Sequence, residues 1–197
     1  MQFDDKLFLF YTGNVRDENW VRHPYQIGAL LDKSGKLEKI DKVLIEQPAE
    51  ATDHFRDPQI FNYKGRFYAI VGGQNLDKQG YVKLYKAVDN DYSNWEVVGN
   101  LDFANDKTAY MMECPNLVFI NDQPVLLYCP QGLSKEVLDY GNIYHSAFIS
   151  FYFFDFIRLS FDCHIFMNKA YSTFSGNGNS QLGFSYRIHS RTHNRNI

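Results

Sequence analysis

The sequence HFRDP at residues 54–58, taken together with ECP at residues 113–115, is the pattern that predicts the fold. Each motif places a carboxylate close to a proline and directly ahead of an apolar run. A proline at the first position of a strand costs no ladder hydrogen bond, and it holds the preceding residue extended. We therefore expect Asp57 and Glu113 to lie at the mouths of two strands, where a rigid sheet directs both carboxyl groups into one cleft. Enzymatic cleavage of a glycosidic bond requires at least two carboxylates positioned in this way.

The same order of strand, tight turn and strand follows both motifs. It is expected over residues 59–71 with a turn at 64–65, and again over residues 117–128 with a turn at 121–122. The step between Asp57 and Glu113 is 56 residues, which suits one four-stranded blade of a β-propeller. Because the innermost strands of a propeller line its channel, this repeat would place both carboxylates at the same end. An antiparallel sandwich of short strands is the rival all-β architecture.

Further strands are expected on both sides of the first motif. Upstream, residues 6–12 predict a strand that ends in a turn at Gly13-Asn14, and a polar loop follows as far as Pro24. The remaining expected elements are a strand at 25–31, a hairpin turn at 32–36, a strand with one wet face at 37–45, an alternating strand at 81–87 and a short strand at 95–98.

Composition agrees with an all-β chain and excludes several classes of partner. Aromatic residues make up 17% of the 197 residues, which favours β structure. The net charge of −3 divides into −6 for residues 1–144 (15 basic, 21 acidic) and +3 for residues 145–197 (5 basic, 2 acidic). The mildly acidic charge of residues 1–144 argues against nucleic acid as a partner. The aromatic run after residue 145 is too short to span a membrane.

Cysteines, histidines and the first residues suggest a cytoplasmic protein without a metal or cofactor. The three cysteines have neither CxxC spacing nor a histidine at metal-ligand distance, and an odd count suits a reducing compartment. The chain opens without a basic and apolar signal peptide. Of the six histidines, four lie beyond residue 144, and His54 is expected to support the loop that carries Arg56.

Five segments, in this order and spacing, resemble the invertase and sucrose-6-phosphate hydrolase family, glycoside hydrolase family 32. They are FLFYTGN (8–14), HFRDP (54–58), FYAIVGGQ (67–74), ECP (113–115) and VLLYCPQGL (125–133). The resemblance covers residues 3–144. It implies a five-bladed β-propeller, of which two to three blades are represented here, and a retaining fructosidase site.

The resemblance also implies a role for each motif residue. Asp57 would stabilise the transition state through the sugar hydroxyls, and Glu113 would be the general acid and base. Arg56 would hold a fructose hydroxyl and keep Asp57 ionised, since a neighbouring cation favours the charged carboxylate. Arg56, Asp57 and Glu113 would together bind the sugar, which the family takes as sucrose, sucrose 6-phosphate or a short fructan.

The family's nucleophile, the Asp of an Asn-Asp-Pro-Asn-Gly motif, has no counterpart, because Asp57-Pro58 is the chain's one Asp-Pro pair. We therefore expect an internal piece of the hydrolase, inactive alone, with residues 1–144 forming a partial catalytic propeller. Residues 145–197 depart from the family pattern and predict a divergent tail, out of frame or disordered, although the aromatic run could be a buried strand. The alternative is a non-catalytic carbohydrate-binding propeller or a remnant without function.

Overall fold

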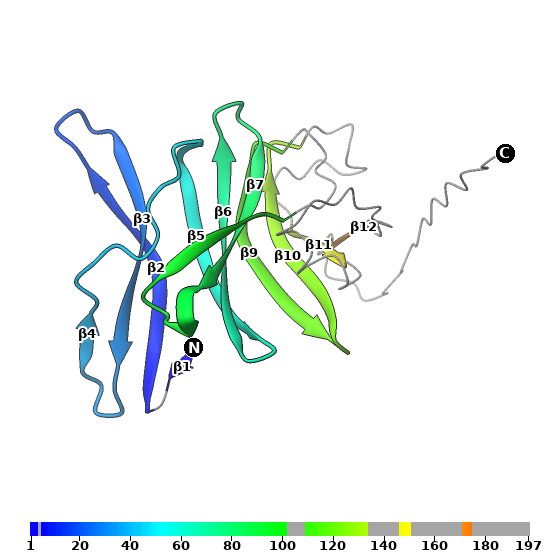
Figure 1. Cartoon of the computed structure of the whole chain (residues 1–197). Coiled ribbons are helices and arrows are strands. Elements are labelled where there is room, and N and C mark those ends of the chain that lie inside the picture. Colours follow the sequence, from blue (N-terminus) through cyan, green and yellow to red (C-terminus); the bar gives the residue numbers. More distant parts are fainter. Residues whose placement is uncertain (4, 102–108, 134–145, 151–170, 175–197) are drawn as a thin grey trace, which may run out of the picture.

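Three four-stranded antiparallel sheets follow one another along the chain (Figure 1). The computed structural model describes residues 1–3, 5–101, 109–133, 146–150 and 171–174. Within each sheet the strands are adjacent in chain order, as in a meander. This arrangement confirms the all-β class. It also disfavours the sandwich, which would divide the strands between two facing sheets.

The strands are as follows. Sheet 1 contains β1 (Gln2–Phe3), β2 (Lys6–Arg16), β3 (Arg22–Leu31) and β4 (Leu37–Lys39). Sheet 2 contains β5 (Ala51–Tyr63), β6 (Arg66–Asn75), β7 (Gly80–Ala87) and β8 (Trp95–Asn100). Sheet 3 contains β9 (Met111–Ile120), β10 (Gln123–Gln131), β11 (Ser146–Ser150) and β12 (Tyr171–Phe174). Strands β11 and β12 come from the expected tail, and the rest of the tail lies outside the described residues. The one helix in the described ranges is the three-residue 3-10 turn η1 (Val88–Asn90), too short to cross a bilayer.

Sheet 1 differs from the expected strand limits at two places. The turn predicted at Gly13-Asn14 is wrong, because β2 continues to Arg16. The chain reverses instead around Asp17, whose Oδ1 accepts hydrogen bonds from the backbone N–H groups of Asn19 and Val21, both at 2.9 Å. The strand predicted at 37–45 is also too long, since only Leu37–Lys39 pairs as a strand, and Ile45 forms an isolated bridge with Gln26.

Two apolar clusters hold neighbouring sheets together. Between sheets 2 and 3, the cluster contains Ile70, Val82 and Leu126, none of which is exposed to solvent. The seam is narrow at Gly72, where an added Cβ would lie 2.1 Å from the carbonyl oxygen of Met112. Only a residue without a side chain lets the two backbones approach this closely.

Glutamine side chains add polar links between the sheets. Gln26, completely buried in β3, donates from Nε2 to the Phe55 carbonyl of β5 at 3.3 Å. Gln59 of β5 both donates to the Leu117 carbonyl of β9 at 3.1 Å and accepts from the Leu117 N–H at 2.6 Å. Because a buried amide is costly when its hydrogen bonds are not made, these links fix the position of each sheet on the next.

A buried lysine gives sheet 2 a pH-dependent contribution to stability. The side chain of Lys83 is 7% exposed, and its Nζ donates to Glu50 Oε1 at 2.5 Å. This hydrogen bond holds the pKa of Glu50 below its ordinary value of 4.5. Since the folded-state pKa is the lower one, the contribution is complete above pH 4.5 and is lost as the pH falls through the folded-state value.

We therefore expect Glu50→Gln to lower the free energy of unfolding by about 1 kcal/mol at pH 7, a small figure because Glu50 is half-exposed. The difference from the parent should shrink as the pH falls below 4.5. Urea unfolding at several pH values measures it, with the exposed Glu46→Gln as the control. A difference that is independent of pH would contradict the assignment.

Candidate active site

Both sequence motifs lie at interruptions inside long strands, and the prediction that they open strands is wrong. Strand β5 begins at Ala51, and its pairing with β6 shifts register between Arg56 and Gln59. The pairing of β9 with β10 shifts in the same way between Leu127 and Cys129. At the two bulges, Asp57 has φ 61° and Cys114 has φ 48°. Bulges and left-handed backbone at residues other than glycine are features that proteins concentrate at functional sites.

The two bulges are equivalent, but not in the way the motifs predict. Arg56 pairs with Gly72, and Glu113 pairs with Cys129, so both members of the pair advance by 57 positions (56 to 113, 72 to 129). The expected 56-residue step from Asp57 to Glu113 is therefore one position too short. Glu113 occupies the place of Arg56, and Cys114 occupies the place of Asp57. Adjacent sheets thus present opposite charges at equivalent positions.

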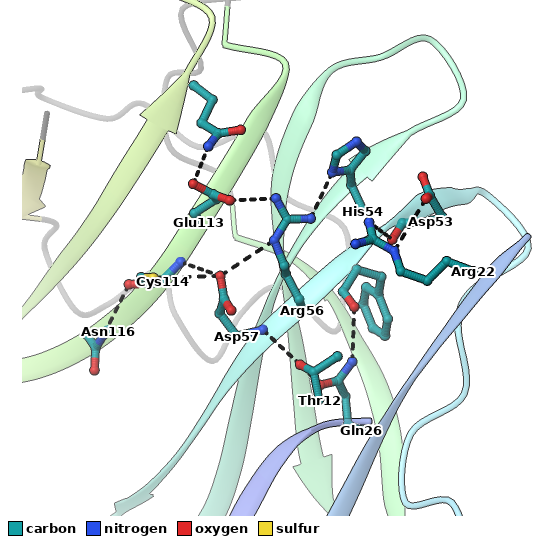
Figure 2. Close-up of polar contacts among 12 residues, drawn as sticks. Thr12, Arg22, Gln26, Asp53, His54, Arg56, Asp57, Glu113, Cys114 and Asn116 are labelled. Atoms are coloured by element: carbon teal, nitrogen blue, oxygen red, sulfur yellow. Dashed lines mark hydrogen bonds and ion pairs between the residues drawn. The ribbon is translucent and has the colours of Figure 1, made fainter. Parts of the chain in front are cut away.

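Arg56 lies at the centre of the cluster that results (Figure 2). Its Nη2 donates to Glu113 Oε1 at 2.5 Å, whereas its Nε is 3.9 Å from Asp57 Oδ2. The expected ion pair of Arg56 with Asp57 is present, but the closer carboxylate is that of Glu113, because Arg56 and Glu113 occupy equivalent bulge positions in neighbouring sheets. The other carboxylate oxygen of Glu113 accepts a hydrogen bond from Gln131 Nε2.

Asp57 is fixed by the sheets on either side of its own. Its backbone N–H donates to Thr12 Oγ1 of β2 at 3.1 Å, and its Oδ2 accepts from the Cys114 N–H of β9 at 3.0 Å. Among the described residues, Asp57 Oδ1 has no hydrogen-bond partner. The side chains of Arg56, Asp57 and Glu113 are 21%, 32% and 24% exposed, so a ligand can reach them.

His54 contacts the guanidinium group of Arg56 and helps to orient it, as expected from the sequence. Its Nδ1 lies 2.8 Å from Arg56 Nη1. Burial, followed by the positive charge of Arg56, lowers the pKa of His54. The ring is therefore neutral at neutral pH, and Nδ1 accepts the hydrogen bond. Arg56 is thereby directed toward the carboxylates.

The thiol of Cys114 is expected to react slowly, although it lies at the solvent-exposed side of the site. Burial of the sulfur, followed by the charge of Asp57, raises the pKa of Cys114 to about 11. Because only the thiolate attacks, at pH 8 about one molecule in a thousand is reactive. Iodoacetamide labelling with peptide mass spectrometry measures the rate, which should rise about tenfold per pH unit from pH 8 to 10. Asp57→Asn should accelerate it, and a fast reaction at pH 7 would contradict this account.

Sequence reasoning missed Thr12 and Gln131, which support Asp57 and Glu113. Both residues lie inside segments used for the family resemblance, so their motif context was the available signal. No group of three or more His, Cys, Asp or Glu side chains in the described ranges could hold a metal ion. His145, His164, His189 and His193 fall outside those ranges.

A family model for the glycosyl hydrolases family 32 N-terminal domain matches residues 1–172. The chain belongs to this family. The match places both bulges, and the cluster of Arg56, Asp57 and Glu113, inside a glycosyl hydrolase domain.

Individual family members support the assignment. The sucrose-6-phosphate hydrolase of Streptococcus mutans is 69% identical over 147 residues, which cover 75% of this chain and 31% of the relative. The structure of a sucrose-6-phosphate hydrolase from Lactobacillus gasseri superposes with a TM-score of 0.71 at 43% identity, covering 77% of this chain and 31% of that one. A mutant of a Bombyx mori family 32 β-fructofuranosidase in complex with sucrose gives a TM-score of 0.66 at 28% identity, covering 76% and 32%. The chain therefore spans about a third of the length of these relatives.

Proposed function

We propose that this chain is part of a retaining glycoside hydrolase that cleaves the fructosyl bond of sucrose 6-phosphate or sucrose. The observation that carries the proposal is the contact of Arg56 with carboxylates from two neighbouring sheets, at 2.5 Å and 3.9 Å. The three sheets are taken as consecutive blades of a five-bladed propeller. The likeness to sucrose-6-phosphate hydrolases over residues shared with them supports the substrate class.

In this mechanism Glu113 is the general acid and base, and Asp57 stabilises the transition state. Positive charge builds up on the fructosyl ring as the bond breaks, and an ionised Asp57 stabilises it electrostatically. Arg56 binds a fructosyl hydroxyl. When the substrate takes over one donor of Arg56, the ion pair with Glu113 is broken. Glu113 can then take up a proton from solvent and pass it to the leaving oxygen, and the resulting carboxylate can later accept a proton as the base.

The nucleophile is the missing partner of these two acids. A retaining glycosidase needs a carboxylate that captures the glycosyl group, and the family's Asn-Asp-Pro-Asn-Gly motif does not occur in the 197 residues. We propose that the chain alone is inactive for this reason. The free thiols of Cys114 and Cys129 suit action in a reducing cytoplasm.

The test is a fructose-release assay on two proteins. The first is the purified 197-residue chain, which should show no turnover. The second is a hybrid in which residues 1–133 replace the aligned segment of the Streptococcus mutans relative, and it should release fructose from sucrose 6-phosphate. Turnover by the chain alone would overturn the role of a missing nucleophile. A folded hybrid that binds sugar without turnover would point instead to a non-catalytic carbohydrate-binding protein.

A further inference from the structure

Two arginines face each other at the end of the β2–β3 hairpin. Arg16 and Arg22 are direct partners in the last rung of the antiparallel ladder. Like charges at opposite positions of such a pair repel each other and destabilise the sheet. A repulsive pair at the rim of a binding site is explained when an anion binds between the two cations.

The pair lies on the face of the hairpin that leads to the candidate active site. Strand side chains alternate, so Arg16 shares a face of β2 with Thr12, whose hydroxyl accepts from the Asp57 N–H. At a rise of about 3.3 Å per residue, the Cα of Arg16 is about 13 Å from that of Thr12. This separation matches the far end of a disaccharide whose fructosyl unit lies over Asp57. Arg22 is anchored to β5, because its Nη2 donates to the Asp53 carbonyl at 2.8 Å (Figure 2).

Among the described residues, nearby carboxylates compensate part of the charge of Arg22 but not that of Arg16. Asp53 Oδ2 forms an ion pair with Arg22 Nε at 3.3 Å, although this buried nitrogen makes no hydrogen bond with the described residues and keeps a donor for a ligand. Asp17 uses Oδ1 in its own turn and Oδ2 on His23. Arg16 has no carboxylate partner in the part of the chain that the structure describes. One of its nitrogens donates to the Trp20 carbonyl at 2.8 Å.

The conformation of Trp20 is a second indication that the hairpin end binds a ligand. Trp20 has φ 62°, which is costly for a large side chain, and it is 75% exposed. The guanidinium carbon of Arg16 lies 5.5 Å from the centre of its ring. Apart from this contact with Arg16, the strained and mostly exposed Trp20 contributes little packing to the fold. Such a ring can stack on a sugar.

We propose that Arg16 and Arg22 form an anion subsite that binds the phosphate of a hexose 6-phosphate unit in the leaving group. The inference rests on the proposed function, because it takes the fructosyl unit to lie at Asp57 and Glu113. It predicts a preference for phosphorylated over plain sucrose, and it places the residues responsible in one hairpin. Arginine suits this role because its planar group donates two parallel hydrogen bonds to a phosphate.

The experiment is a calorimetric titration of the 197-residue chain with glucose 6-phosphate, with glucose and inorganic phosphate as comparison ligands. Glucose 6-phosphate should bind, glucose should bind at least tenfold more weakly, and added salt should weaken binding of the phosphorylated sugar. Arg16→Gln and Arg22→Gln should each reduce its affinity at least tenfold. Arg66→Gln, a matched change at the exposed first residue of β6, should leave the affinity unchanged.

Unchanged affinity in Arg16→Gln, or no binding of glucose 6-phosphate by the folded parent chain, would overturn the subsite. Arg16→Gln is the decisive variant, since Arg22→Gln also removes a contact with β5. Inorganic phosphate that binds as tightly as glucose 6-phosphate, and loses affinity in the same variants, would still support an anion subsite. The titration involves no fructosyl transfer. A hybrid enzyme that fails to release fructose would therefore count against the proposed function and not against this subsite.

Discussion

In the hybrid enzyme, Glu113→Gln is expected to lower fructose release from sucrose 6-phosphate by about 10²–10⁴-fold, the usual contribution of general acid–base catalysis. Glutamine keeps the size of the side chain and an oxygen for Arg56 Nη2, so the bulge should remain intact. What is lost is a proton for the leaving oxygen. An aryl fructoside, whose leaving group departs without protonation, should therefore lose much less in the bond-breaking step.

Steady-state and single-turnover rates on both substrates measure this difference. Glu38→Gln is the matched control, because Glu38 lies on the short strand β4 at the far edge of sheet 1. It should behave as the parent. Equal losses on the natural and the activated substrate would show that Glu113 acts by positioning Arg56, and the acid–base role would then be wrong.

Among the glycines that the structure describes, Gly72 should be the one whose replacement by alanine destabilises the protein most. The new Cβ would be 2.1 Å from the Met112 carbonyl oxygen and 3.3 Å from that of Arg56. Overpacking against movable side chains costs about 1–3 kcal/mol. Because both obstacles here are backbone atoms, we expect a loss of at least about 3 kcal/mol in the free energy of unfolding.

Urea unfolding curves provide the measurement, with Gly13→Ala as the control. At Gly13 the nearest atom to an added Cβ is the end of the Ile27 side chain, at 2.7 Å, which can rotate away. Gly72→Ala should also disturb the site, since Gly72 is the ladder partner of Arg56. A Gly72→Ala variant as stable as Gly13→Ala would mean that sheets 2 and 3 pack less tightly than described.

The sequence predicts the sheets well because each strand pair depends on local signals. Alternation of apolar residues and turn pairs such as Lys64-Gly65 define β5 and β6 without any distant contact. The turn after β2 escaped prediction because the Gly13-Asn14 signal is overridden by ladder pairing, which continues through both residues to Arg16. The residue at which such a strand ends is therefore decided by its pairing with the neighbouring strand.

The site was harder to predict, because its geometry depends on two bulges. Asp57 and Glu113 were identified from the nearby prolines and from the family resemblance, but a bulge changes which residue faces the neighbouring sheet. Aligning Pro58 with Pro115 would have shown that Arg56 corresponds to Glu113 and Asp57 to Cys114. The contact between Arg56 and Glu113 follows from that correspondence together with the packing of β5 on β9.

Asp57 accepts a hydrogen bond from the Cys114 N–H of sheet 3 and donates one to the Thr12 hydroxyl of sheet 1. A single residue of sheet 2 therefore links all three sheets. Under the proposed function, a substrate that binds Asp57 therefore favours the joined sheets over any state in which they separate. By thermodynamic linkage, a change that loosens the sheets weakens the affinity for sugar in proportion to the fraction of molecules in which the sheets have separated. Under the proposed function, sugar affinity therefore reports the fraction of molecules in which the sheets are joined, and Gly72→Ala should weaken binding once that fraction falls, although residue 72 itself need not touch the ligand.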